Sequence, residues 1–206
     1  MVKMLDLDPA AQEVVRLLDG VDDDRLDAPT PCADMPVAAL LDHLVGLSLA
    51  FTWAARKTPP AADGEPVGPG LATTEHLDPK WRELLPQRLE ELVAAWRDPE
   101  AWQGVTEAGG VTMPASDMGV VALDELVLHG WDLARATGQE FRCDPASTAA
   151  VLAFTTEAAR PEHAAQRAGL FGPVVEVPPD TPALDRALGL AGRDPRWTPD
   201  RAAGKA

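Results

Sequence analysis

Three titratable side chains, Glu125, His129 and Asp132, follow one another at spacings of four and three residues. Side chains at these spacings stack on one face of an α-helix. The segment around them, VALDELVLHGWDLARATG, is apolar over nearly its whole circumference, which is typical of a helix inside a protein. Buried titratable groups must be paired, metal-bound or strongly shifted in pKa. The three residues therefore form a candidate chemical site that needs a partner.

A second histidine, His43, lies in another largely apolar segment that we predict to be helical from about residue 36 to 57. Its helix face is otherwise apolar, so we expect the imidazole to point inward. Two imidazoles and one carboxylate, from His43, His129 and Glu125, would form a His2Glu zinc site with one open position. A cation there lowers the pKa of a bound water or thiol. Asp132 would either orient His129 or accept a proton near the open position.

Each of these residue patterns also has a purely structural explanation. A Glu-x3-His pair is often only a contact on a helix surface, and a histidine on an apolar face is often hydrogen-bonded to a carbonyl. Cys32, just before the second helix, is either a thiol activated by the helix dipole or a packed small residue. Arg135 would bind a carboxylate substrate or form a salt bridge.

Composition narrows the class of protein. The 206 residues are enough for one sizeable core, so we predict a single domain over 1–206. The net charge of −15, from 33 acidic and 18 basic residues, argues against nucleic acid and against an anionic membrane as partners. The two cysteines and the absence of a signal-peptide pattern predict the cytoplasm. No run of about 18 consecutive apolar residues suggests a membrane span.

The elements that must position these residues are mostly helices, which predicts an all-α bundle with at least one crossover connection. We expect the bundle at about 8–160 and a C-terminal extension at about 161–206, with a short helix before a frayed tail. Pro86 should kink or restart the third helix, and a short hairpin is expected around residues 109–110. The predicted long helices cover residues 8–20, 36–57, 78–97, 117–136 and 144–160.

Three stretches carry a resemblance to a known family: PTPCADMPVAALLDHLVG, DELVLHGWDLARATGQ and LFGPVVEVPPDTPALDRALGLAGRDPRW. In order and spacing they resemble signatures of an actinobacterial metal-binding family of the DinB-like superfamily. That superfamily includes the N-terminal domain of mycothiol-dependent maleylpyruvate isomerase. The resemblance spans nearly the whole chain and implies a DinB-like four-helix bundle with additional short C-terminal helices.

The resemblance also implies a metal site and a class of reaction. It makes His43, Glu125 and His129 the ligands of a divalent metal, zinc first, with nickel or iron as alternatives. The chain departs from the family at Met35, where tryptophan is usual, and at Glu125, where many relatives have histidine but the isomerase-type branch has glutamate. The separate C-terminal domain of the isomerase is replaced by about 45 residues. A homodimer is also implied.

The leading hypothesis is a metal-dependent thiol transferase or isomerase. A small-molecule thiol such as mycothiol would be ionised at the metal and attack a small electrophile, with Asp132 as the orienting or proton-handling residue. The alternatives are a non-catalytic metal- or ligand-binding helical bundle, and a purely structural helical protein with a Glu125–His129 hydrogen bond.

Overall fold

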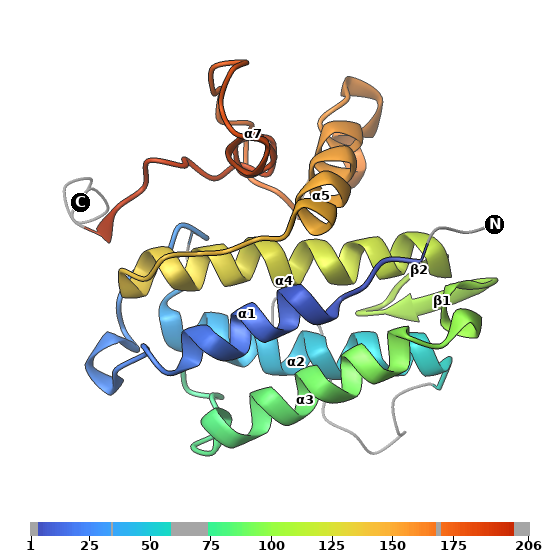
Figure 1. The fold of residues 1–206 in the computed structure, drawn as a ribbon, viewed down its shortest axis with the longest axis horizontal. Helices are drawn as coiled ribbons and strands as arrows, with labels where there is room; N and C mark the ends of the chain where they lie inside the picture. Colours follow the sequence, from blue (N-terminus) through green and yellow to red (C-terminus); the bar gives the residue numbers. More distant parts are fainter. Residues whose placement is uncertain (1–3, 34, 59–73, 168–169, 200–206) are drawn as a thin grey trace.

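The computed structural model describes residues 4–33, 35–58, 74–167 and 170–199 (Figure 1). This part of the chain is mainly helical, as predicted. The longer helices are α1 (Asp8–Leu18), α2 (Val37–Arg56), α3 (Trp81–Trp96), α4 (Ala115–Thr137) and α5 (Pro145–Ala158). The shorter elements are η1 (Asp23–Arg25), η2 (Pro99–Trp102), η3 (Pro161–His163), α6 (Ala164–Arg167) and α7 (Ala183–Leu190).

Helices α1 to α4 form the four-helix bundle that the DinB-like resemblance implies. Helix α2 packs against α3 and α4, and α1 packs against the other sides of α3 and α4. Helix α4 is also covered by α5, so protein surrounds it on most sides. This position explains why its sequence is apolar around the whole helix rather than along one stripe.

A short antiparallel hairpin joins the end of the third helix to α4. Strands β1 (Val105–Ala108) and β2 (Val111–Pro114) pair around Gly109 and Gly110, both of which have positive φ. This confirms the predicted hairpin. The Thr106 hydroxyl donates a hydrogen bond to the Ala54 carbonyl at 2.6 Å. The hairpin is therefore fixed against the C-terminal part of α2 and leads directly into α4.

The helix ends follow the chemistry of their residues. The Asp144 carboxylate accepts hydrogen bonds from the first backbone N–H groups of α5, as its Asp-Pro sequence predicts. Gly138 ends α4 with φ of 72°, a left-handed conformation that glycine adopts without steric cost. Of the two effects predicted for Pro86, a restart does not occur, because α3 continues through it as a single helix, while the kink stays a prediction. The predicted loop 58–75 falls largely outside the described residues.

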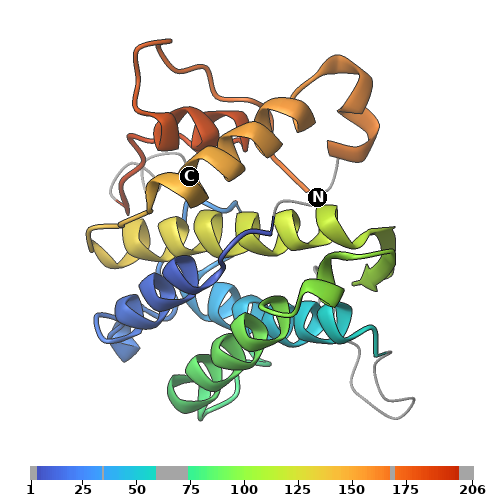
Figure 2. The ribbon, with the colours of Figure 1, turned by 45° about the vertical axis from the view of Figure 1, so that its right-hand side comes forward.

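The C-terminal part of the chain forms a second layer on α4. Helices α5 and α7 pack against each other on the side of α4 opposite α2 and α3 (Figures 1 and 2). The segment after α7 then returns to α4, where Arg135 donates a hydrogen bond to the Trp197 carbonyl. Helix α5 therefore groups with the C-terminal extension rather than with the four-helix core, while the division near residue 160 stays a prediction.

Helix α2 is long and apolar enough to meet the length and hydropathy criteria for a membrane span, although the sequence contains no uninterrupted apolar run of that length. Within the described residues it is the one such helix, and 67% of the qualifying window is buried. That burial is the pattern of a core helix.

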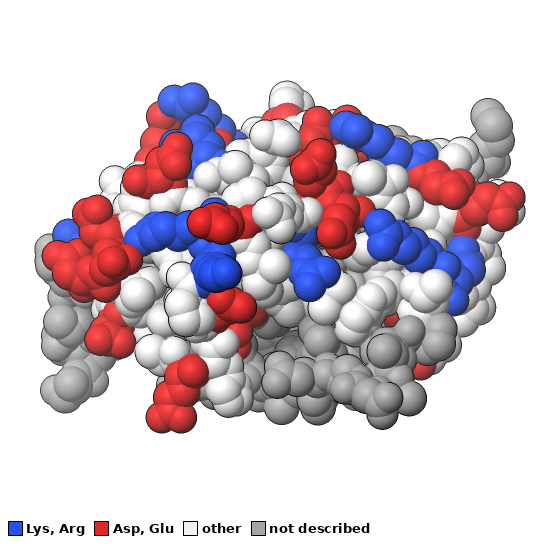
Figure 3. Space-filling view, turned by 90° about the horizontal axis from the view of Figure 1, so that it is seen from below, with Lys and Arg blue, Asp and Glu red and all other residues white. Residues whose placement is uncertain are grey.

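On the face of the molecule seen in Figure 3, acidic and basic side chains are interspersed.

Candidate metal centre

The bundle brings His43, Glu125 and His129 together, as the sequence predicted. Helix α2 supplies His43 and the neighbouring α4 supplies the other two. One carboxylate oxygen, Oε2 of Glu125, lies 3.3 Å from His43 Nε2 and 3.0 Å from His129 Nε2. The two imidazole rings meet edge to face with centroids 4.8 Å apart. Both imidazoles therefore direct Nε2 at the same carboxylate.

This arrangement suits a divalent metal in both chemistry and spacing. The candidate ligand atoms of His43, Glu125 and His129 all lie within 4.8 Å of one another. Tetrahedral zinc with bonds of about 2.0–2.1 Å places neighbouring ligand atoms about 3.3 Å apart. The distances from Glu125 Oε2 to the two nitrogens are already close to that value. The two histidine side chains are only 8% exposed, whereas Glu125 is 24% exposed, so the site reaches solvent beside its carboxylate.

The acidic and basic groups of the site stabilise one another's ionised forms. Burial opposes ionisation of Glu125, but hydrogen bonds from His129 and His43 prevail and hold its pKa well below the usual range. Burial likewise opposes protonation of His129, but hydrogen bonds to Asp132 and Glu125, together with their charges, raise its pKa to about 9. The site therefore offers a stable carboxylate and attracts positive charge.

Asp132 lies on the far side of His129 and fixes the orientation of the ring. Its Oδ2 is 3.1 Å from His129 Nδ1, and the carboxylate is fully buried. An N–H donated by Nδ1 to this oxygen leaves the lone pair of Nε2 directed at the candidate metal position. Of the two roles predicted for Asp132, this geometry favours orientation, because a proton acceptor at the open position would have to face Nε2.

A buried arginine completes this chain of contacts. Arg193, which follows α7, donates from Nη2 to Asp132 Oδ2 at 3.0 Å and from Nη1 to the Ala191 carbonyl at 3.1 Å. Burial opposes ionisation of Asp132, but the Arg193 charge and the hydrogen bond to His129 hold its pKa below the usual value. Arg193, Asp132 and His129 thus connect the C-terminal layer to the candidate metal position.

A second group of potential ligands, Cys32, His129 and Asp132, also lies within 4.8 Å. The guanidinium of Arg193 already occupies Asp132 and places a positive charge there. A cation bound at the same carboxylate would be repelled. Within the described residues no lysine or arginine pairs with Glu125, so the group of His43, Glu125 and His129 is the better metal site.

Comparison with known families gives a match over residues 7–134 to the model of the mycothiol maleylpyruvate isomerase N-terminal domain. The match covers more than half of the chain. The protein belongs to this family. The matched segment includes His43, Glu125, His129 and Asp132, and it ends before Arg193.

Two solved structures share the fold of this family member. The crystal structure of the mycothiol-dependent maleylpyruvate isomerase aligns with a TM-score of 0.57 and 17% identity, over 93% of this chain and 79% of that chain. A histidine-to-alanine mutant of that enzyme aligns with a TM-score of 0.56 and 18% identity over the same shares. The search of curated proteins found no match. The alignments confirm a DinB-like helical fold and extend beyond the N-terminal family segment.

Other residues singled out in the sequence have structural positions. Arg135 donates to the Trp197 carbonyl and forms no salt bridge with the described residues, while its predicted role in binding a carboxylate stays a prediction. Cys143 packs against the core, and burial raises the pKa of its thiol. His163 lies away from the centre and pairs with Glu157 at 3.1 Å. Among the described residues, the sequence analysis did not anticipate Arg193 or the buried Asp124, whose carboxyl interacts electrostatically with Glu125, His129 and Arg193.

Zinc binding to this site should release a proton at neutral pH. In the metal-free protein the pKa of His129 is about 9, so its imidazole is protonated at pH 7. Zinc requires the lone pair on Nε2, and the proton must therefore leave. We expect about one proton released per zinc at pH 7, and an apparent affinity that rises until about pH 9 and then levels off. Calorimetric titrations in buffers of different ionisation enthalpy measure this number. A heat of binding that does not depend on the buffer would contradict the assignment.

Proposed function

We propose that this protein is a metal-dependent thiol transferase or isomerase, which uses a small thiol such as mycothiol to attack a small electrophile. The observation that carries the proposal is the convergence of His43 and His129 on Glu125 within a family named for a mycothiol-dependent isomerase. We further propose a divalent metal, zinc first, as the resident cofactor of these three residues.

The donor set determines what the site would do. A zinc ion held by three protein ligands supplies Lewis-acid chemistry that lowers the pKa of a thiol at its open position. Cys32 groups with His129 and Asp132 and not with His43 and Glu125, so we do not assign it as a fourth ligand. The partial exposure of Glu125 leaves a path by which a small molecule reaches the open position.

The remaining groups hold the ligands in place. Asp132 keeps His129 in the tautomer and orientation that ligation needs, and Arg193 keeps Asp132 ionised. Burial of these two groups between α4 and the C-terminal layer protects their hydrogen bonds from competition with water. In this proposal Asp132 and Arg193 are positioning residues, and the thiol and electrophile meet on the Glu125 side.

A chelator experiment tests the proposed activity. Purified protein would be assayed with mycothiol and a panel of electrophiles that includes maleylpyruvate, before and after treatment with a strong chelator, and again after one equivalent of zinc. We expect thiol-dependent turnover that is lost on chelation and restored by zinc. Turnover that survives complete removal of metal would contradict metal dependence.

A non-catalytic metal-binding bundle is the second candidate. The observation in its favour is that His43 and His129 belong to two core helices, so a metal between them would brace α2 against α4. If the protein is such a bundle, removal of the metal by a chelator should lower the melting temperature strongly, and no thiol should support turnover. The chelator experiment separates the two functions when melting temperature is recorded on the same samples.

A further inference from the structure

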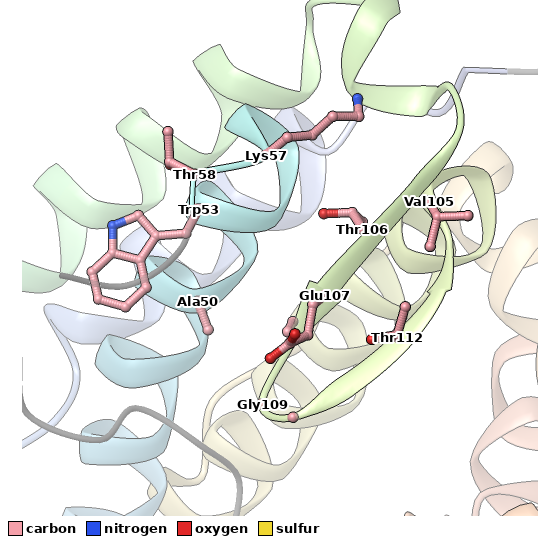
Figure 4. A pocket seen from close by; sticks show the side chains of 11 residues that line it. Ala50, Trp53, Lys57, Thr58, Val105, Thr106, Glu107, Gly109 and Thr112 are labelled. Atoms are coloured by element: carbon pink, nitrogen blue, oxygen red, sulfur yellow. The ribbon is translucent and has the colours of Figure 1, made fainter. Parts of the chain in front are cut away.

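A pocket of about 430 Å³ with both polar and apolar lining lies between the C-terminal part of α2 and the hairpin β1–β2 (Figure 4). Trp53 of α2 and Glu107 of β1 lie on opposite sides of the pocket, and Ala50 of α2 lies between them. The two glycines of the hairpin turn and three threonines complete most of the lining. None of these residues belongs to the candidate metal centre.

The pocket and the metal centre lie along the same two helices. Ala50 follows His43 by 7 residues and faces within about 20° of it on α2, and Lys57 caps the end of the same helix. Ala50 is therefore about 10 Å from His43 along the helix axis. On the other side, α4 leads from Glu125 back to its first residue, Ala115, which directly follows the hairpin. A molecule anchored at the open position would reach the pocket with a tail of about 10 Å.

The lining offers hydrogen-bonding groups, an aromatic surface, and one side chain of each charge, Lys57 and Glu107. The ammonium of Lys57 donates to the Glu100 carbonyl, and the hydroxyl of Thr106 donates to Ala54. Glu107 is exposed and forms no ion pair within the described part of the chain. Trp53 is half-buried, so part of its indole is available to a ligand.

We propose that this pocket binds an uncharged sugar or polyol group carried by the thiol cosubstrate. The inference rests on the proposed thiol function and names the part of the cosubstrate that gives specificity. An indole stacks on the C–H face of a sugar ring, as aromatic side chains do in many apolar contacts. A carboxylate and threonine hydroxyls accept and donate hydrogen bonds to its hydroxyl groups.

Two thiols separate recognition of the sugar from binding of sulfur. Mycothiol carries its cysteinyl thiol on an amino-sugar and inositol, whereas N-acetylcysteine lacks both. Calorimetry with zinc-loaded protein should show that Trp53→Ala weakens mycothiol about tenfold and Glu107→Gln about threefold, with N-acetylcysteine changed less than twofold. Trp53→Phe should restore most of the affinity, and Glu90→Gln, an exposed change on α3, should have no effect. Equal losses for both thiols, or no loss for either, would overturn the pocket assignment.

A thiol-free probe tests the pocket independently of the metal. The glucosaminyl-inositol part of mycothiol, N-acetylated so that it carries no charge, would be titrated into metal-free protein. We expect a shift of the Trp53 indole N–H resonance, assigned with Trp53→Phe, and no shift in Trp53→Ala. If this probe shifts the resonance but no thiol binds the zinc protein, the proposed thiol function fails while the pocket stands. No shift, or a shift caused only by free charged glucosamine, would overturn the inference.

Discussion

Replacing His43 with alanine should abolish stoichiometric zinc binding while leaving the protein folded. The substitution removes one of three ligands and leaves Glu125 and His129, which are neighbours on a single helix. Loss of an outer-shell partner already costs about 10–100-fold in metal affinity, and loss of a ligand should exceed that. We therefore expect zinc affinity to fall more than about 100-fold. Competition with a chromophoric chelator, together with elemental analysis, measures the change.

The matched control is His163→Ala. His163 also pairs with a glutamate on the preceding turns, but it is partly exposed and lies on the C-terminal layer. This variant should retain one zinc per chain and full affinity. If His43→Ala binds zinc as tightly as the His163→Ala control, the assignment of His43 as a ligand is wrong.

Replacing Arg193 with alanine should lower the free energy of unfolding by about 3 kcal/mol, near the lower end of the range for breaking a buried ion pair, because Asp132 then keeps only His129 as a partner. Arg193 is 7% exposed and Asp132 is fully buried. Most of the cost arises from the incompletely compensated carboxylate rather than from a lost attraction. Zinc affinity should also fall about 10–100-fold, since Asp132 orients His129. Urea denaturation measures the first effect and chelator competition the second.

Two further variants separate this effect from a general loss of charge. Arg196→Ala removes a nearby arginine whose side chain is 80% exposed, and it should change stability by less than about 1 kcal/mol. Combining Arg193→Met with Asp132→Asn removes both charges and should recover much of the stability lost in Arg193→Ala. Zinc affinity should stay weakened in the double variant, because the carboxylate that orients His129 is gone. Equal stability of Arg193→Ala and Arg196→Ala would contradict the buried pair.

The sequence was sufficient to predict the bundle and the three residues at its centre. Helical spacing places Glu125 and His129 on one face whatever the tertiary packing, and an apolar helix with a single inward histidine leaves His43 few other partners. The same local rules located the hairpin and the ends of α4 and α5. These features depend on residues within about one or two helical turns, which is why they can be read from the chain.

The contacts that the sequence did not predict join distant segments. Arg193 lies 61 residues after Asp132, in a segment without helical periodicity, so no spacing connects the two. The pocket likewise depends on how the hairpin folds back onto α2, which brings Glu107 near Trp53. Pro86 illustrates the opposite case, since tertiary packing maintained a helix that local propensity would interrupt.

X-ray absorption at the zinc edge tests the central claim most directly, because it reports the ligands of the metal itself. Zinc-loaded protein should show two imidazole ligands and oxygen ligands at about 2.0–2.1 Å, and addition of mycothiol should introduce one sulfur at about 2.3 Å. His43→Ala should lose one imidazole from this spectrum. A protein that binds no stoichiometric zinc, or a zinc with four protein ligands and no sulfur after the thiol is added, would contradict an open metal centre at His43, Glu125 and His129.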